Sequence, residues 1–413
     1  MTTSDRWQWM RDELEQLKRK AQYRTLHATA MAGEGWIVKN GRSMLNLASN
    51  DYLGLGQAPY ERPSGPDAEN DLPVSTSDSS CAADILHPSG LRAGSGASRL
   101  ITGHDPVYAL FEQEFAAFKG TEGCLVFGSG YMANIGIISS ILQRGDEVFS
   151  DRLNHASIVD GIILSRAEIH RYRHKDLDHL ESLLKKSEPG KKKLIVTDAV
   201  FSMDGDLAPL AELVELKERY GAMLMVDEAH SGGVYGQLGE GLVHALGLGV
   251  RVDIQMGTFS KAYGVYGAYA AGDSILIEYL INKARSFIFT TALPPMVVQA
   301  VHDHWQRSVR EGWRREQLHE KSAWFRERLK ALGFDTGLSE SQIIPLMIGG
   351  NREAVAFAEK LQEAGIAAVA IRPPTVPEGE ARIRFSLMAT HTYSDLEQAL
   401  GTIEAIGKDL SIV

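Results

Sequence analysis

The chain is poor in cysteine, has no surplus of basic residues and contains no long apolar run. Its two cysteines among 413 residues, Cys81 and Cys124, lack metal-ligand spacing, so neither a disulfide framework nor an oxidising compartment is expected. A net charge of −10 leaves no excess of lysine and arginine for binding nucleic acid. No apolar stretch approaches the roughly 18 residues of a membrane span, and the first residues carry mixed charges unlike a signal peptide. These absences favour a soluble, cytoplasmic protein.

Several catalytic motifs are also absent. The chain has no G-x-S-x-G elbow, no H-E-x-x-H, no paired C-x-x-C, no P-loop and no G-x-G-x-x-G turn. These absences disfavour the common serine hydrolases, zinc peptidases, nucleotide hydrolases and dinucleotide-binding enzymes. We predict no metal site.

What the chain does contain is an alternation of short apolar runs with helical segments. The runs are residues 125–127, 147–150, 169–172, 193–197, 223–226, 254–256 and 268–271. Such alternation predicts βαβ units, and therefore an α/β fold with a mostly parallel central sheet flanked by helices. After a helical region at 296–331, further runs at 343–347, 367–371 and 382–387 predict a smaller α/β domain, whose last helix we expect to be capped by Ser394.

The composition divides the chain into four parts. We expect an N-terminal helix with short strands (1–55), a loop rich in Pro, Ser and Asp (56–93), a large domain (94–293) and a C-terminal α/β domain (294–413). The first helix has one apolar stripe, which could pack on its own domain or on a second subunit. The stripe consists of Trp7, Met10, Leu14, Leu17 and Ala21.

One lysine, Lys261, follows an apolar run and lies among small and hydroxyl-bearing residues. The glycines at 264 and 267 allow the backbone to approach a ligand closely, and the hydroxyls of Thr258 and Ser260 could donate hydrogen bonds to a phosphate. Lysine is the side chain that forms Schiff bases with carbonyl compounds and with pyridoxal phosphate (PLP). Taken alone, however, a lysine of this kind is more often an ordinary loop residue.

Asp227 and His230 come directly after another predicted strand, in the order Asp-Glu-Ala-His. An aspartate in this place could be a helix cap, or it could keep a pyridine nitrogen protonated and so make the ring a better electron sink. His230 could reach a ring oxygen. Because ligands of parallel sheets bind at the carboxyl ends of strands, both residues belong to the predicted binding edge.

Further polar turns follow other strands of the predicted sheet. His155 could be a structural histidine or an aromatic plate against a cofactor ring, and Ser202 could be a plain turn residue. Gly130 and Tyr131 begin a helix, where backbone N–H groups could hold a phosphate. None of these signals is specific by itself.

In this combination and order, the chain resembles the α-oxoamine synthase family of fold-type I PLP enzymes, from about Tyr23 to its C-terminus. The motifs that carry the resemblance are Ser49-Asn50-Asp51-Tyr52-Leu53-Gly54, Gly94-Ser95-Gly96, Asp151-Arg152-Leu153-Asn154-His155-Ala156-Ser157, Phe201-Ser202-Met203-Asp204-Gly205, Asp227-Glu228-Ala229-His230 and Thr258-Phe259-Ser260-Lys261. The resemblance implies PLP as cofactor and a homodimer with shared active sites. A catalytically inactive relative would be expected to have lost Lys261 or Asp227, and both are present.

Matched residue by residue, the resemblance implies a role for each polar turn. Lys261 and His155 would be the catalytic residues, Lys261 as covalent anchor and proton-transfer base and His155 stacked on the ring. The remaining cofactor contacts would be Asp227 at the pyridine nitrogen, Ser202 and His230 at the ring hydroxyl, Thr258, Gly130 and Tyr131 near the phosphate or ring, and Thr290 and Thr291 at the phosphate of the partner subunit.

The resemblance also implies substrates. The segment 370–377, with Arg372 and Thr375, is similar to that of biotin-pathway members, which join L-alanine to a pimeloyl thioester, either pimeloyl-CoA or pimeloyl-acyl carrier protein. Arg384 matches the arginine that binds the amino-acid carboxylate, which suits its bidentate geometry. Arg24 and Asn50 match further substrate contacts. The alternative is a glycine-using member such as 2-amino-3-ketobutyrate CoA ligase.

Overall fold

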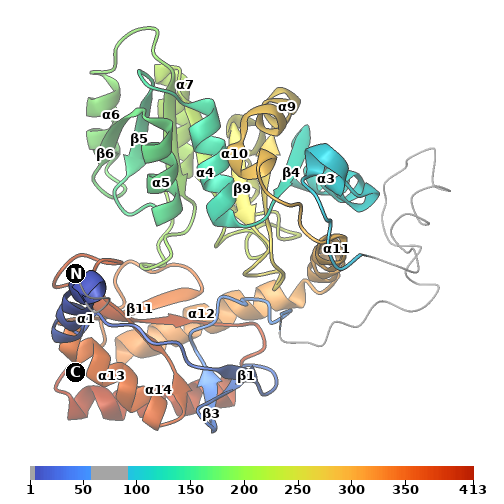
Figure 1. The fold of residues 1–413 in the computed structure, drawn as a ribbon. Helices are drawn as coiled ribbons and strands as arrows, with labels where there is room; N and C mark the ends of the chain where they lie inside the picture. Colours follow the sequence, from blue (N-terminus) through green and yellow to red (C-terminus); the bar gives the residue numbers. More distant parts are fainter. Residues whose placement is uncertain (1–4, 57–91) are drawn as a thin grey trace. The chain divides into compact units, whose positions relative to one another are not determined.

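The computed structural model describes residues 5–56 and 92–413 and divides the chain into two compact units (Figure 1). The terminal unit comprises Met1–Gln57, Ser202–Asp206 and Glu316–Val413, and the sheet unit comprises Ala58–Phe201 and Leu207–Arg315. The loop predicted at 56–93 lies almost entirely outside the described residues, and so its structure is not described. Cys81 lies outside them as well. The predicted division of the chain into four parts stays a prediction. Among the described helices, none has the length and apolar character needed to cross a membrane.

The sheet unit is built on a seven-stranded sheet with the order β4-β10-β9-β8-β7-β5-β6. Its strands are β4 (Gly123–Phe127), β5 (Glu147–Asp151), β6 (Glu168–Tyr172), β7 (Lys193–Asp198), β8 (Met223–Asp227), β9 (Ile254–Thr258) and β10 (Ala268–Gly272). β10 is antiparallel to both of its neighbours, whereas all other pairs are parallel. The predicted mostly parallel α/β sheet is therefore confirmed, and each predicted run lies within one strand.

Alternate strand residues enter cores on opposite faces of this sheet. On β7, Leu194 and Val196 belong to one core, while Ile195 between them belongs to another, as the two-residue period of a strand requires. The first core is covered by α4 (Gly130–Ile141), α5 (Ala156–Ser165), α9 (Ser274–Lys283) and α10 (Arg285–Ile288). The second is covered by α6 (Leu177–Leu184), α7 (Leu210–Tyr220) and α8 (Leu242–Ala245). Burial on both faces explains why these strands are continuously apolar.

A third core joins β4 and β10 to α3 (Pro106–Lys119) and α11 (Pro295–Arg310). Helix α3 begins at Asp105, whose carboxylate accepts from the backbone N–H of Val107 at 3.3 Å, and ends at Gly120 with φ +65°. The helical region predicted at 296–331 is two helices, because the chain leaves helical geometry at Glu311 before α12 (Trp313–Ala331) begins.

The terminal unit joins the two ends of the chain. One sheet has the order β1-β2-β3-β12, formed by β1 (Thr29–Met31), β2 (Trp36–Lys39), β3 (Arg42–Asn46) and β12 (Ile366–Ala367). The other contains β11 (Ile343–Gly349), β14 (Ala381–Ser386) and β13 (Val369–Ile371). The strand predicted at 367–371 is thus divided between two sheets.

Helices α13 (Asn351–Glu363) and α14 (Tyr393–Asp409) complete the terminal unit. The prediction that Ser394 caps the last helix is wrong. Thr392 is the N-cap, and its hydroxyl accepts from the backbone N–H of Asp395 at 3.0 Å. Since a threonine hydroxyl caps a helix as a serine hydroxyl does, the helix begins two residues earlier than Ser394 indicated.

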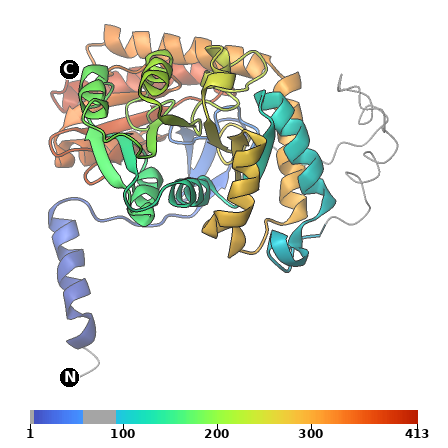
Figure 2. The same cartoon turned by 90° about the horizontal axis from the view of Figure 1, so that it is seen from above.

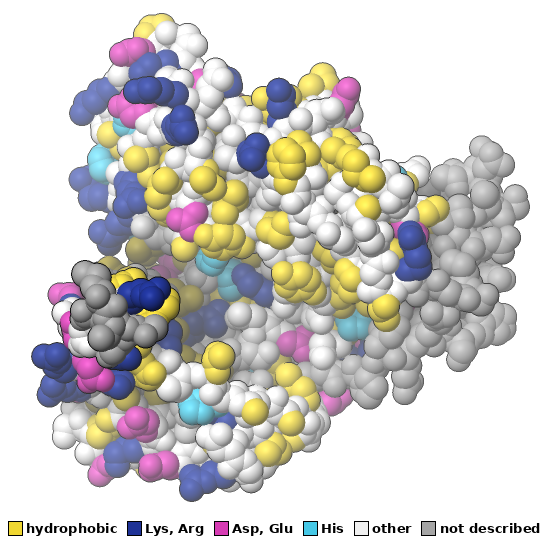
Figure 3. All heavy atoms as spheres, in the orientation of Figure 1, with side chains coloured by type: hydrophobic (Ala, Val, Ile, Leu, Met, Phe, Trp, Pro, Cys, Tyr) yellow, Lys and Arg dark blue, Asp and Glu magenta, His cyan; other side chains and the backbone are white. Residues whose placement is uncertain are grey.

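The apolar stripe of the first helix, α1 (Gln8–Arg19), drawn in blue next to the N-terminus in Figure 2, is exposed in part, whereas Leu17 and Ala21 are half-buried. Trp7, Met10 and Leu14 are 53%, 37% and 44% exposed. Exposed apolar side chains also gather on the sheet unit over α4, α5 and α10 (Figure 3), where Ile163, Leu164 and Phe289 are among them.

Candidate active site

A pocket of about 180 Å³ lies at the carboxyl ends of β7, β8 and β9. This is the edge at which ligands bind in open parallel sheets. The pocket brings together seven of the predicted site residues: Gly130, Tyr131, His155, Asp227, His230, Thr258 and Lys261. They come from four different segments of the sheet unit, so the sheet topology, not closeness in sequence, assembles them.

Asp227 is the last residue of β8 and is almost fully buried. Its Oδ2 accepts from Asn134 Nδ2 at 2.8 Å, and its Oδ1 accepts from the backbone N–H of Ala229 at 2.9 Å. Two donors therefore hold the carboxylate in one orientation inside the pocket.

A second carboxylate, Asp198, ends β7 directly beside Asp227 in the strand register. Burial, together with the neighbouring Asp227 charge, raises the pKa of Asp198 well above its ordinary value. Asp198 Oδ2 accepts from the backbone N–H of His155 at 2.8 Å. The pair thus consists of one carboxyl group that favours its protonated form and one that is held by two donors.

Lys261 follows β9 at the pocket, and its Nζ lies 2.6 Å from His230 Nε2. The chain turns immediately afterwards, where the backbone N–H of Gly264 donates to the Lys261 carbonyl at 2.9 Å. Gly264 has φ +66°, a conformation that glycine adopts at little cost. The amine is therefore held at the pocket by a tight turn on one side and an imidazole on the other.

His155 is the N-cap of α5, and its Nδ1 lies 2.7 Å from Ser157 Oγ. The ring borders the open side of the pocket. Desolvation by the surrounding protein lowers the pKa of His155; the Asp227 charge opposes this shift and Lys261 adds to it. His155 is thus biased toward neutral imidazole.

The groups that the sequence analysis predicted to bind a phosphate also lie together at this edge of the sheet. Gly130 begins α4, whose N-cap Ser129 accepts from the backbone N–H of Met132 at 3.2 Å. A Cβ placed on Gly130 would lie 3.7 Å from Thr258 Cβ, so the helix N-terminus and the end of β9 are close neighbours. Thr258 Oγ1 in turn lies 2.7 Å from Ser260 Oγ. A helix N-terminus beside two hydroxyls is a suitable anion site.

Other predicted site residues lie elsewhere. Thr290 and Thr291 line a separate, smaller cavity of the sheet unit. Ser202, Asn50 and Arg384 belong to the terminal unit, where Arg384 Nε donates to the Ser202 carbonyl at 2.5 Å and a terminal nitrogen donates to Asn50 Oδ1 at 3.0 Å. The sequence-predicted carboxylate arginine and the turn serine are therefore direct neighbours.

Arg24, Arg372 and Thr375 form a second group in the terminal unit. The Arg372 guanidinium donates to the Ala21 carbonyl, and the backbone N–H of Thr375 donates to the Arg372 carbonyl at 3.1 Å. Burial, followed by the nearby charge of Arg24, lowers the pKa of Arg372. The two arginines thus share one region, as expected for a site that receives an anionic substrate.

Sequence reasoning missed three polar residues of the pocket: Asn134, Ser157 and Asp198. Asp198 ends an apolar strand just as Asp227 does, so the same reasoning would have found it. Ser157 lies inside the quoted histidine motif. Asn134 interrupts the mostly apolar first two turns of α4, and that break in the apolar pattern was its signal.

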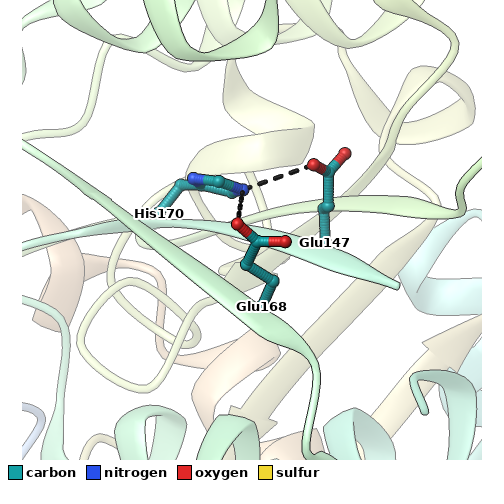
Figure 4. A group of neighbouring side chains, drawn as sticks. All are labelled: Glu147, Glu168 and His170. Carbon is teal, nitrogen blue, oxygen red and sulfur yellow. Dashed lines mark ion pairs between the residues drawn. The ribbon is translucent and has the colours of Figure 1, made fainter. Parts of the chain in front are cut away.

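Within the described ranges, one group outside the pocket has metal-ligand spacing. The ligand atoms of Glu147, Glu168 and His170 all lie within 4.8 Å of one another (Figure 4). However, Lys191 Nζ lies 3.7 Å from Glu147 Oε1 and 3.6 Å from Glu168 Oε2. Because this ammonium already supplies the positive charge, we interpret the group as an ion-pair network.

Comparisons with known proteins show the family of the chain. The family model for aminotransferase class I and II matches residues 42–403. The chain belongs to the aminotransferase class I and II family. Two relatives of this family member carry the provisional name 8-amino-7-oxononanoate synthase. The one from Geobacillus kaustophilus is 52% identical over 402 residues, covering 97% of this chain and 98% of the relative. The one from Bacillus cereus is 51% identical over 401 residues, covering 97% of each.

Solved structures of the same fold include enzymes with two different names. A serine palmitoyltransferase of S. paucimobilis with bound PLP–myriocin has a TM-score of 0.86 and 30% identity, with 100% of both chains covered. The 8-amino-7-oxononanoate synthase of Francisella tularensis has a TM-score of 0.71 and 29% identity, covering 90% of this chain and 99% of that one. The likeness confirms the predicted fold class.

Proposed function

We propose that the chain is a PLP-dependent acyltransferase that condenses L-alanine with a pimeloyl thioester. The products are 8-amino-7-oxononanoate, carbon dioxide and the free thiol, a step of biotin biosynthesis. The observation that carries this proposal is the roughly 50% identity, over nearly the full length of both chains, to relatives with that provisional name.

The donor set of the pocket fits PLP. An amine (Lys261), a buried carboxylate (Asp227) and a helix N-terminus beside hydroxyls (Gly130, Thr258) match the aldehyde, the pyridine nitrogen and the phosphate of that cofactor. His155 would stack on the ring. When bound, PLP supplies an electron sink for the α-carbon of the amino acid.

The protein's own groups then handle the proton and the substrate charge. Lys261 is proposed to anchor the cofactor covalently and, once displaced by the substrate amine, to carry the α-proton at Nζ. Asp227 keeps the pyridine nitrogen protonated, and the two donors to its carboxylate fix its position. His230, 2.6 Å from Lys261 Nζ, orients that amine.

Substrate selection is assigned to the terminal unit. Arg384, oriented by the Ser202 carbonyl and Asn50, is proposed to bind the alanine carboxylate. Arg24, Arg372 and Thr375 are proposed to contact the acyl donor, carried on CoA or on acyl carrier protein. The proximity of the two arginine charges supports an anionic ligand there.

A homodimer with shared active sites is part of the same proposal. Exposed apolar side chains on α1, its N-cap residue and α5, among them Met10, Trp7 and Ile163, support a protein interface. Thr290 and Thr291 would serve the phosphate site of the partner subunit. Light scattering coupled to size exclusion would test the assembly, since a monomer that retained full activity would contradict it.

The test of function is a product assay that crosses three amino acids with three acyl donors. Alanine, glycine and serine are combined with pimeloyl-CoA, pimeloyl-acyl carrier protein and acetyl-CoA, and the aminoketone is identified by mass spectrometry. Turnover only with alanine and a pimeloyl donor is expected. Preference for serine would favour the second candidate, a serine-using enzyme, which the TM-score of 0.86 to serine palmitoyltransferase supports. Preference for glycine with acetyl-CoA would favour the glycine-using alternative.

A further inference from the structure

Four side chains of the pocket form an unbroken hydrogen-bonded chain from His155 to Asp227. His155 Nδ1 lies 2.7 Å from Ser157 Oγ, Asn134 Nδ2 lies 2.9 Å from Ser157 Oγ, and the same Asn134 nitrogen lies 2.8 Å from Asp227 Oδ2. Ser157 is 0%, Asn134 1% and Asp227 3% exposed. Because water does not compete at such burial, the two bonds that Asn134 makes are strong and directional, whereas the His155 ring at the end of the chain is exposed.

The direction of every bond follows from one backbone group. The backbone N–H of Ser157 also donates to His155 Nδ1, at 3.3 Å, and a backbone N–H can only donate. Nδ1 is therefore an acceptor without a proton. The two amide hydrogens of Asn134 go to Ser157 Oγ and Asp227 Oδ2, which leaves the hydroxyl hydrogen of Ser157 for Nδ1. The ring proton of His155 must then reside on Nε2.

One buried atom without a hydrogen-bond partner indicates that the Asn134 side chain has a role beyond packing. Asn134 Oδ1 is buried and has no hydrogen-bond partner among the described residues. Leaving a buried amide oxygen unpaired costs free energy, and such groups in native proteins are concentrated at functional positions. Rotating the amide would turn its oxygen toward the Asp227 carboxylate, so the charge of Asp227 fixes the orientation that leaves Oδ1 unpaired.

We propose that Asn134 and Ser157 are positioning residues that keep His155 neutral, with its proton on Nε2, and couple that state to the carboxylate of Asp227. The inference rests on the proposed function, in which His155 and Asp227 face the cofactor. A neutral His155 would stack on the cofactor ring without adding a second positive charge beside a protonated pyridine nitrogen.

The charges around His155 do not act in one direction. Asp227 on β8 and Asp160 on α5 favour its protonated form, whereas Lys261 after β9 disfavours it. Asp198 on β7 contacts its backbone N–H. Desolvation and the Lys261 charge together outweigh the two carboxylates, and the two Ser157 donors act in the same direction because they bind an unprotonated Nδ1.

The test is an NMR titration of the holoenzyme labelled at histidine with ¹³C and ¹⁵N, with the His155 signals assigned from a His155→Asn variant. In the unaltered protein, the ¹⁵N shifts should show an unprotonated Nδ1 and a protonated Nε2. Ser157→Ala should raise the pKa of His155 by about half to one pH unit, because the neutral ring loses a donor. Asn134→Leu should raise it in the same direction. Ser157→Thr, which keeps the hydroxyl, should restore the original value.

Two results would overturn the inference. One is a proton on Nδ1 in the unaltered protein, a measurement that needs no variant to fold. The other is an unchanged His155 pKa in both Ser157→Ala and Asn134→Leu together with a lowered melting temperature, since a purely structural tie between α4 and α5 would give that pattern. Product formation is measured separately. An inactive holoenzyme with the expected shifts would refute the proposed function alone, and an active one without them would refute this inference alone.

Discussion

Replacing Lys119 by methionine should destabilise the sheet unit strongly, because it leaves a carboxylate buried without its counter-ion. Lys119 Nζ lies 2.5 Å from Glu228 Oε2, and both side chains are 0% exposed. Breaking a buried pair on one side costs about 3–5 kcal/mol. Glu228 keeps two donors, the Ser231 hydroxyl at 3.1 Å and the backbone N–H of Val243 at 2.9 Å. We therefore expect the lower end, about 3 kcal/mol, because these two donors still stabilise the carboxylate.

Thermal unfolding measured by circular dichroism tests this value. For a unit of this size, about 3 kcal/mol corresponds to a fall in melting temperature of about 6–12 °C. Two controls are matched to it. Lys185→Met removes the exposed partner of Glu181 in the same unit and should change stability by less than about 1 kcal/mol. Lys119→Met combined with Glu228→Gln should recover most of the loss, because no unpaired charge remains. A single Lys119 variant that melts like the unaltered protein would refute the reasoning.

Two further predictions concern pH and backbone geometry. Burial alone would lower the pKa of His302, but the two carboxylates beside it raise it to about 9. The contribution of this charge to the free energy of unfolding is therefore complete below about pH 6.5 and is lost as the pH rises toward 9. Urea unfolding measured at a series of pH values should show this loss. Glu114→Gln should make the loss smaller, because one of the two carboxylates is removed. Gly205→Ala would place Cβ 1.9 Å from the Ile343 carbonyl oxygen, at φ +71°. This variant should destabilise the terminal unit by several kcal/mol. The control Gly41→Ala, with open space around its Cβ, should cost only about 1 kcal/mol. Equal melting temperatures for the two variants would contradict this prediction.

The fold was predictable because its signals are local. Apolar runs on both faces of a parallel sheet are continuous in sequence, and Asp105 beside Pro106 marks a helix start by capping chemistry alone. Where two hydroxyl residues stand at one helix start, as Thr392 and Ser394 do, the residue type alone does not decide between them, and the structure has Thr392 as the cap.

The site was predictable only in part, for a physical reason. Polar residues that end strands, such as Asp227, are found by the rule that parallel strands present their carboxyl ends together. Asn134 and Ser157 lie on helices, and their role depends on α4 and α5 meeting beside β8, a tertiary arrangement that no single segment encodes. The place of Thr290 and Thr291 likewise depends on tertiary structure, because the cavity that they line also has walls from α3, β4 and α10.

The most direct test of the central claim is to locate the lysine that binds the cofactor. The holoenzyme is incubated with PLP, reduced with borohydride to fix any Schiff base, digested, and its peptides are identified by mass spectrometry. The account predicts one modified peptide, which contains Lys261, and its loss in Lys261→Ala together with the visible absorption of the protein. Modification at a different lysine, or a Lys261→Ala protein that keeps both its colour and its turnover, would contradict it.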